Sequence, residues 1–427
     1  MSIDNLSFAP FPPAGWNSFD CFGSAVTEAE VFANAEILAR ELLPAGYDTI
    51  VVDYCWSHPS PGACANPDQA KGSQPYLAID ADHRLLPAPS RFPSATDGAG
   101  FKPLADRVHA LGLKFGLHIM RGFPLQALYP AFPTKTTGGL RVADIADPAD
   151  TCSWLNHMCG VRATPAGQAY YDSLFRLYAD WGVDYVKVDD IAQPYRAVEI
   201  EMVDLARRRC GRPITLSLSP GACPLDQATH VARHAELWRV SPDFWDRWED
   251  LRRAFELCRL WAPHRVPGAW PDPDMLPVGR LSRRGPAGPE RESFFTPAEQ
   301  RTLLALWSLF HAPLFIGGDL RVMDRTTLDL LRDPALARIR REGLGANCVA
   351  HDEHQSIWVS ASADGQTRFV GVFNLSDHDT PSPCITAALG LDASAFQITA
   401  LWPEQSHLAA HDVALWSLSP ARAPAPA

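Results

Sequence analysis

Short apolar runs alternate with longer segments of helical periodicity over about the first 320 residues of the chain. β-Branched and aromatic side chains dominate the short runs, which is typical of buried strands, whereas apolar residues recur at helical spacing between them. Eight strands are predicted, at 15–19, 49–54, 114–119, 185–190, 213–219, 237–241, 268–270 and 312–317. The main helices are predicted at 27–43, 101–111, 167–181, 196–210, 244–260 and 297–310.

Eight strand-plus-helix units predict a parallel (β/α)8 TIM barrel. An open doubly wound sheet is disfavoured because neither GxGxxG nor GxxxxGK[ST] is present. After about residue 340 the pattern changes to alternating strands separated by Gly and Asp turns. We therefore predict a catalytic barrel over 1–340 and a small C-terminal antiparallel β-sandwich domain over 341–427.

Charge and cysteine content narrow the function classes. The chain of 427 residues has 49 acidic and 38 basic side chains, a formal charge of −11, which disfavours a nucleic-acid partner. No apolar stretch approaches a membrane span, and the N-terminus lacks the basic and apolar regions of a secretory signal. The ten cysteines include no CxxC pair, which favours free thiols in a reducing compartment. These features predict a cytoplasmic protein and leave a homo-oligomer open.

Polar side chains end the apolar runs. In a barrel the reacting groups come from the carboxyl ends of the strands and from the loops that follow them. A ring rich in carboxylates is therefore expected there, formed by Asp53, His118, Asp189, Asp190, Ser217, Ser219, Arg239, Ser241, Asp243, Asp272 and Asp274.

The sharpest signal lies in the run Tyr185-Val-Lys-Val-Asp-Asp190. Lys187 and Asp189 are two residues apart, so both side chains point to one side of the strand, and the flanking valines make that side the barrel interior. A lysine beside a carboxylate keeps the carboxylate ionised and nucleophilic at neutral pH. The alternative is a structural ion pair at a strand end.

A pair of carboxyl groups suggests glycoside hydrolysis, which needs one anionic and one protonated member. Asp189 fits the anionic member. Asp243 is followed by Phe244 and Trp245, an apolar setting that would favour its protonated form. By spacing alone, Asp243 could equally cap the helix that begins at Phe244.

Metal chemistry is the main competing use of an acidic barrel mouth. The first strand has no HxH motif, HExxH is absent, and the cluster His351-Asp-Glu-His354 falls at an expected hairpin turn. Carboxylates such as Asp189 and Asp274 could in principle hold Mg²⁺. We expect no metal and no cofactor.

Six motifs follow one another along the barrel part of the chain: Gly15-Trp-Asn-Ser-Phe19, Val52-Asp-Tyr-Cys-Trp56, Val186-Lys-Val-Asp189, Arg239-Val-Ser-Pro-Asp243, Trp270-Pro-Asp-Pro-Asp-Met-Leu276 and Ala312-Pro-Leu-Phe-Ile-Gly-Gly-Asp-Leu320. In their order and spacing, the chain resembles glycoside hydrolase family 27 over about residues 13–325. The family includes α-galactosidases, α-N-acetylgalactosaminidases, β-L-arabinopyranosidases and isomaltodextranases. The resemblance implies a barrel followed by an antiparallel β domain, and a retaining double displacement without a cofactor.

The resemblance also implies roles for single residues. Asp189 corresponds to the nucleophile, Lys187 to its sugar-contacting neighbour, and Asp243 to the acid/base, with Arg239 near the 2-hydroxyl. Further sugar-binding positions are Phe19, Asp53 and Asp274. Aromatic rings near the mouth are expected to stack on sugar faces, namely Phe19, Trp56, Trp245 and Trp270.

Departures from the family pattern fall on specificity positions. Tyr54 stands where α-galactosidases have a second Asp that grips galactose, and His118 replaces a tyrosine. Ser219 lies in the loop that reads the 2-substituent. The family disulfide after the third and fourth strands is missing, since Arg121-Gly-Phe123 and Asp190-Ile191 stand at its cysteines.

The leading hypothesis is a retaining exo-glycoside hydrolase that resembles α-galactosidases and acts on small glycosides. One alternative keeps the mechanism but changes the glycone to an α-glucosidic or β-L-arabinopyranosidic one, as Tyr54 favours. The other is a non-catalytic carbohydrate-binding relative.

Overall fold

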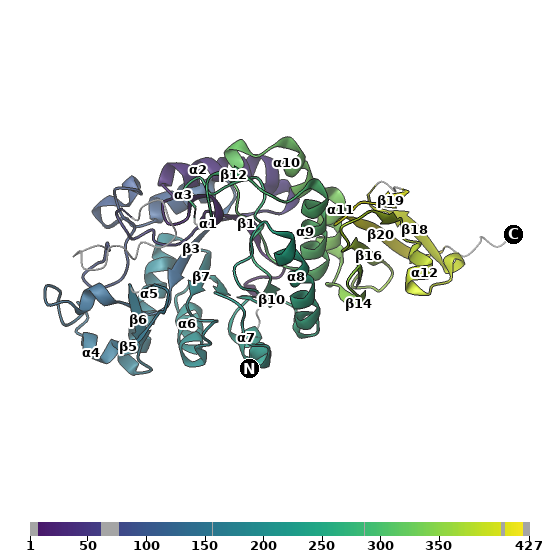
Figure 1. The fold of residues 1–427 in the computed structure, drawn as a ribbon. Coiled ribbons are helices and arrows are strands. Elements are labelled where there is room, and N and C mark those ends of the chain that lie inside the picture. Colours follow the sequence, from purple (N-terminus) through teal and green to yellow (C-terminus); the bar gives the residue numbers. More distant parts are fainter. Residues whose placement is uncertain (1–6, 61–76, 156, 286, 403–405, 422–427) are drawn as a thin grey trace. The chain divides into compact units, whose positions relative to one another are not determined.

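The computed structural model describes residues 7–60, 77–155, 157–285, 287–402 and 406–421 (Figure 1). The chain folds into two compact units. The first comprises 1–243, 266–293 and 314–323, and the second comprises 244–265, 294–313 and 324–427. The domain boundary near residue 340 stays a prediction.

Eight parallel strands form the sheet of the first unit. They are β1 (Ala14–Asn17), β2 (Thr49–Val52), β3 (Lys114–Met120), β7 (Tyr185–Asp189), β8 (Thr215–Leu218), β9 (Leu237–Arg239), β10 (Trp270–Asp272) and β13 (Leu314–Ile316). Their order is β10-β9-β8-β7-β3-β2-β1-β13, and every described pairing is parallel. A parallel bridge between Leu276, just after β10, and Ile316 joins the two edges. The predicted TIM-like barrel is therefore confirmed.

Seven α-helices are described in the same unit: α1 (Phe19–Phe22), α2 (Glu28–Ile37), α3 (Lys102–Ala110), α4 (Val142–Ile145), α5 (Pro165–Trp181), α6 (Ala197–Arg209) and α7 (Ala228–His234). The predicted seventh strand was placed slightly early, because β10 is a short strand that contains Pro271 and ends before Pro273. Proline has no N–H for a strand ladder, which limits the length of such a strand.

Two small sheets were not predicted. One is formed by β4 (Phe123–Pro124), β5 (Ala146–Thr151) and β6 (Met158–Val161), between β3 and α5. The other pairs β11 (Arg280–Leu281) with β12 (Arg291–Glu292). Their strands are only two to six residues long, so no periodicity marks them.

The second unit contains helices and an antiparallel sheet. The helices are α8 (Trp248–Trp261), α9 (Pro297–Phe310), α10 (Arg325–Leu331), α11 (Pro334–Glu342) and α12 (Ile385–Leu389). The sheet has the order β14 (Asn347–His351), β15 (Gln355–Ala361), β16 (Arg368–Asn374), β20 (Val413–Pro420) and β18 (Phe396–Ala400), and β17 (Thr380–Pro381) pairs with β19 (His407–Leu408). The antiparallel C-terminal sheet is confirmed.

The predicted helix starts are also visible. Thr296 precedes α9. Its hydroxyl accepts from the Glu299 N–H at 3.2 Å, and the Thr296 N–H donates to the Glu299 carboxylate at 2.8 Å. Thr27 and Glu30 form the equivalent capping box before α2. Each box satisfies backbone donors that a helix N-terminus leaves without partners.

Apolar side chains from several barrel strands meet in one interior cluster. It contains Val51, Tyr185, Leu237, Met275 and Phe315, with Phe19 packed against it. Because strand side chains alternate, residues two and four positions after Tyr185 point to the same interior. The polar residues at the carboxyl ends of the strands therefore lie next to this apolar cluster, on the same interior side of the sheet.

Candidate active site

Lys187 and Asp53 form the innermost ion pair of the barrel mouth. Lys187 lies on β7 and Asp53 directly follows β2, and the Lys187 Nζ donates to Asp53 Oδ2 at 3.2 Å. Burial would raise the pKa of Asp53, but the Lys187 charge, His118 and bonds from Tyr54 and Asn17 hold it well below its usual range. Burial would lower the pKa of Lys187, but Asp53 and Asp189 raise it. Both groups are thus charged at neutral pH.

Asp189 ends β7 and is held by two neighbouring strands. His118 on β3 places Nε2 3.1 Å from Asp189 Oδ2, and the Ser219 hydroxyl, after β8, donates to Asp189 Oδ1 at 3.1 Å. The strand register pairs His118 with Lys187 and Met120 with Asp189, which sets this arrangement. Burial acts to raise the pKa of Asp189, but the hydrogen bond from His118 and the Lys187 charge outweigh it and lower the pKa below 3.8. Asp189 is therefore an oriented carboxylate.

Arg239 organises the opposite side of the mouth. Its Nη2 lies 2.7 Å from Asp274 Oδ2 and 3.3 Å from Asp243 Oδ1. Burial would lower the pKa of Arg239, but Asp274, Asp243, Asp272 and Asp189 together raise it. One buried guanidinium therefore interacts with four of the carboxyl groups.

Asp243 differs from the other carboxyl groups in its exposure. Its side chain is 65% exposed, whereas that of Asp189 is 15% exposed. The expectation that Phe244 and Trp245 give Asp243 an apolar setting is thus wrong. Asp243 precedes α8 by several residues, because that helix begins at Trp248 with Arg247 as its N-cap residue. A capping role for Asp243 is therefore also not observed.

Tyr54 forms an aromatic and apolar wall beside Asp53. Its ring packs edge-on against Phe19 and His118, with centroids 6.1 and 5.8 Å away, and lies 6.4 Å from the ring of Trp154. The same cluster includes Met120, Cys152, Leu155 and Met158. Aromatic and apolar side chains thus pack around the position where α-galactosidases have a second carboxylate.

Trp56 and Trp270, two of the aromatic residues predicted to stack on a sugar, are buried in the protein. Trp56 is 2% exposed, its Nε1 donates to the His118 carbonyl at 2.6 Å, and its ring packs edge-on against Phe101 and Trp181. Trp270 is buried and donates to the carbonyl of Ala9 at 3.1 Å. The prediction that Trp56 stacks on a sugar is therefore corrected, since its faces are used in packing near α3 and α5.

Sequence reasoning missed three residues at the mouth, namely Asn17, Ser18 and Asp20. Asn17 donates to Asp53 Oδ2 at 2.7 Å, and the Ser18 hydroxyl accepts from the Asp53 N–H at 3.0 Å. Burial and neighbouring carboxylates raise the pKa of Asp20 well above its usual value and that of Asp272 to about 6. Asn17 and Ser18 lie inside the motif that was quoted for the first strand, so their position was the available signal.

A buried ionic network stands where the family disulfide was expected. Arg121, 1% exposed, contacts Asp190 Oδ2 at 3.0 Å, Glu199 Oε2 at 2.9 Å and Asp150 Oδ1 at 3.0 Å. The hydroxyl of Tyr171 donates to Glu199 at 2.6 Å. This network joins the segment after β3 to the segment after β7, immediately behind Asp189.

Two carboxylates of the mouth are paired with protein cations, Asp53 with Lys187 and Asp274 with Arg239. Among the described residues, one group has metal-ligand spacing, and it comprises Glu201, His230 and His234 on α6 and α7 rather than the mouth. His351 and His354 lie at the ends of the β14–β15 turn, as predicted. Nine cysteines are free, and Cys64 lies outside the described residues.

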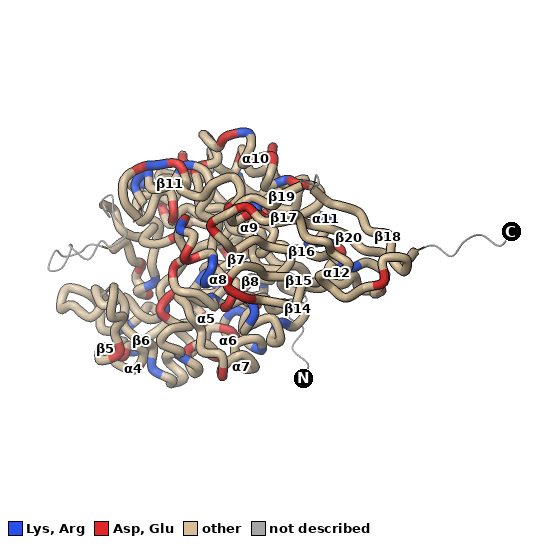
Figure 2. Tube along the Cα trace, turned by 45° about the vertical axis from the view of Figure 1, so that its right-hand side comes forward, with Lys and Arg blue, Asp and Glu red and all other residues tan. Residues whose placement is uncertain are grey.

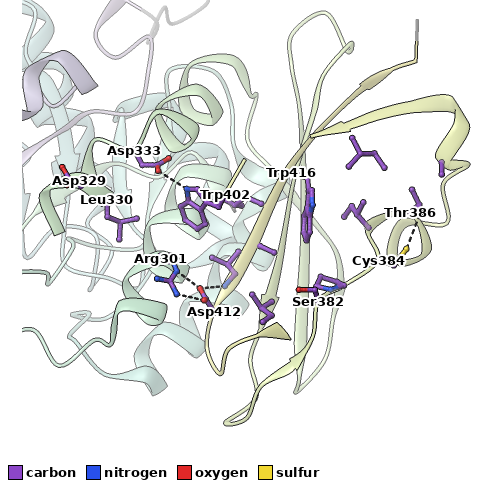
Figure 3. Close-up of a pocket in the computed structure, with 18 residues that line it drawn as sticks. Arg301, Asp329, Leu330, Asp333, Ser382, Cys384, Thr386, Trp402, Asp412 and Trp416 are labelled. Atoms are coloured by element: carbon purple, nitrogen blue, oxygen red, sulfur yellow. Dashed lines mark hydrogen bonds and ion pairs between the residues drawn. The ribbon is translucent and has the colours of Figure 1, made fainter. Parts of the chain in front are cut away.

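A cavity of about 680 Å³ lies within the second unit (Figure 3). Its carboxylates serve structural contacts, since Asp412 accepts from Arg301 Nε at 2.9 Å and Asp333 accepts from Trp402 Nε1 at 3.0 Å. Asp333 also caps α11. The barrel mouth is therefore the better candidate for carboxylate chemistry.

Comparisons with known proteins agree with this geometry. The family model described as alpha galactosidase A matches residues 155–342. An α-galactosidase of Oryza sativa subsp. japonica is 26% identical over 96% of this chain and 85% of that protein. A GH27 β-L-arabinopyranosidase of Geobacillus stearothermophilus is 42% identical, with a TM-score of 0.91 and full coverage of both chains. A putative α-N-acetylgalactosaminidase of Bacillus halodurans is 38% identical, with a TM-score of 0.82 over 96% of this chain and 98% of that one.

A TIM-like barrel with ordered carboxylates at its mouth, together with these likenesses, defines a glycoside hydrolase. The chain belongs to glycoside hydrolase family 27. No described helix has the length and apolar character needed to span a membrane.

Replacing Arg121 by Met should lower the free energy of unfolding by about 3–5 kcal/mol, because Asp190 and Glu199 would keep buried charges without a partner. Urea denaturation measures the change. Arg40→Ala is the matched control, since Arg40 is 61% exposed in its pair with Glu41 and should cost less than about 1 kcal/mol. Equal effects of the two substitutions would contradict the role given to the network.

Proposed function

We propose that the chain is an exo-acting β-L-arabinopyranosidase that works by a retaining double displacement. The observation that carries the choice of sugar is the apolar wall of Tyr54 beside Asp53. β-L-Arabinopyranose has the ring of α-D-galactose without its hydroxymethyl group. Beside Tyr54, the 6-hydroxyl of a galactoside would find no carboxylate to bind, and a buried hydroxyl without a partner costs binding energy. Arabinopyranose has no 6-hydroxyl and avoids this cost.

The similar enzyme of Geobacillus stearothermophilus supports this choice. It is described as a β-L-arabinopyranosidase, and a variant of it has been solved with arabinose at 42% identity to this chain. The α-galactosidase relatives are more distant, at 25–27% identity. A small neutral carbohydrate is the proposed substrate, because the two cations at the mouth, Lys187 and Arg239, are already paired with Asp53 and Asp274.

In the first step, Asp189 attacks the anomeric carbon while Asp243 protonates the leaving oxygen. The lowered pKa of Asp189 supports the nucleophilic role, because it keeps the carboxylate ionised at neutral pH. Hydrogen bonds with His118 and Ser219 fix the orientation of that carboxylate. A bound glycoside would cover the exposed Asp243, and burial favours the protonated form of a carboxylic acid. Arg239 contacts Asp243 and would orient it.

In the second step, Asp243 takes a proton from water, and that water opens the ester between the sugar and Asp189. The anomeric configuration is inverted twice and so is retained overall. Lys187 and Asp53 would hydrogen-bond the sugar hydroxyls, and Phe19 would contact the sugar face. We also propose a cytoplasmic location, which the nine free cysteines support.

Asp189→Ala should lower kcat on a nitrophenyl β-L-arabinopyranoside by on the order of 10⁴-fold, because the nucleophile is removed. Azide should restore turnover and give the azide of inverted, α configuration, identified by NMR. Asp243→Ala is the matched variant, and its azide product should keep the β configuration. The opposite stereochemistry in the two variants would overturn the assignment of roles.

Removing the hydrogen bond from His118 should raise the pKa of Asp189, because that bond favours the carboxylate. The acid limb of kcat/KM should therefore move to higher pH in His118→Phe, because more of Asp189 would be protonated at a given acidic pH. A pH profile of kcat/KM measures the shift, and circular dichroism at each pH monitors folding. An unchanged acid limb would argue against this control of Asp189.

The wild-type enzyme should prefer the β-L-arabinopyranoside in a panel with nitrophenyl α-galactoside, α-N-acetylgalactosaminide and α-glucoside. Tyr54→Asp should raise the ratio of kcat/KM for galactoside over arabinopyranoside at least about tenfold, because a carboxylate can bind the 6-hydroxyl. Tyr54→Phe keeps the wall and should leave the ratio within about twofold. The ratio does not depend on the folded fraction, and a wild-type preference for galactoside would overturn the proposed sugar.

A further inference from the structure

Two helices outside the barrel mouth present a compact group of metal-binding side chains. Helices α6 and α7 lie side by side (Figures 1 and 2). Glu201 lies on α6, and His230 and His234 lie four residues apart on α7, which places both imidazoles on one face of that helix. One ligand atom from each residue lies within 4.8 Å of the others.

His234 is oriented by a carboxylate. Its Nδ1 lies 3.0 Å from Asp204 Oδ2, so Nδ1 carries the proton and Nε2 keeps its lone pair. Asp204 is fixed in turn by Arg207 Nη2 at 2.6 Å and Arg208 Nε at 2.8 Å. A carboxylate on the far nitrogen is the usual support of a metal-binding histidine, because it fixes the tautomer and the ring orientation.

His230 is oriented by a tyrosine. Its Nδ1 lies 2.6 Å from the Tyr195 hydroxyl and its Nε2 lies 3.2 Å from Glu201 Oε1. Without a metal, Tyr195 would donate to Nδ1 and His230 would donate to Glu201. That arrangement gives no role to the Nε2 of His234, whose ring lies 4.6 Å from the ring of His230.

We propose that this group binds one divalent transition-metal ion, Zn²⁺ in particular, through Nε2 of His230, Nε2 of His234 and the carboxylate of Glu201. Two imidazoles and one carboxylate suit Zn²⁺ rather than Mg²⁺ or Ca²⁺, which prefer oxygen ligands alone. Water completes the tetrahedron at the half-exposed site. The ion has a structural role, because it cross-links α6, which follows the strand of Asp189, to α7, which follows β8.

The test uses the full chain after chelator treatment and dialysis, titrated with zinc sulfate by calorimetry. We expect one ion per chain and a rise in Tm with zinc, because a ligand of the folded state stabilises it. His230→Ala and His234→Ala should each weaken zinc binding at least tenfold and abolish the rise in Tm. Glu201→Gln, an isosteric change at an exposed residue, should weaken binding without disturbing the fold.

Tyr195→Phe tests whether the tyrosine hydroxyl beside His230 supports zinc binding. It removes only the hydroxyl beside His230, and loss of such a support should weaken zinc binding about tenfold. Co²⁺ in place of Zn²⁺ should give tetrahedral visible bands that His234→Ala loses.

His354→Ala is the matched control, since His354 lies at the exposed β14–β15 turn and should leave binding unchanged. The proposal is overturned if the chain shows no saturable one-to-one binding, if the α7 variants bind zinc as the wild type does, or if His354→Ala alone removes binding.

Discussion

The buried ammonium group of Lys187 is the charge on which the barrel mouth depends. It contacts Asp53 and lies in the field of Asp189 and Asp274, so it lets several carboxyl groups lie close together at the barrel mouth. Arg239 does the same on the other side. Two cations do not suffice for every carboxyl group, and the raised pKa values of Asp20 and Asp272 show which ones remain without compensation. The charge state of each carboxyl group thus depends on its burial, its hydrogen bonds and its distance from these two cations.

The position of many residues at the mouth could be predicted, because successive side chains of a barrel strand point alternately to the interior and to the exterior. The two-residue spacing of Lys187 and Asp189, next to Val186 and Val188, was enough to place both inside. Exposure could not be predicted in the same way. Asp243 follows its strand in a loop, where no periodicity says whether its apolar neighbours turn toward it or away. Trp56 was misplaced for the same reason, since a tryptophan after a strand can turn toward a sugar or, as here, toward Phe101 and Trp181.

Contacts between segments far apart in the sequence were the other limit. The small sheet of β4, β5 and β6 lacks an apolar pattern, and the group of Glu201, His230 and His234 is formed by two helices whose packing no local signal announces. The His-x3-His spacing on α7 can be read from the sequence, but the approach of Glu201 on α6 cannot. The resemblance to the family assigned roles to residues whose roles the sequence pattern alone did not indicate. Tyr54 and Arg121 depart from the family pattern, and at both positions the structure has different interactions from those expected in the family.

The Arg121 network has a consequence for how the site is assembled. A disulfide at these positions would require an oxidation step, and disulfide formation takes seconds to hours. Ion pairs between Arg121, Asp190 and Glu199 form as the chain packs, at the pace of folding itself. The segment behind Asp189 can therefore reach its final geometry in the presence of thiols, and it needs no oxidising catalyst to do so.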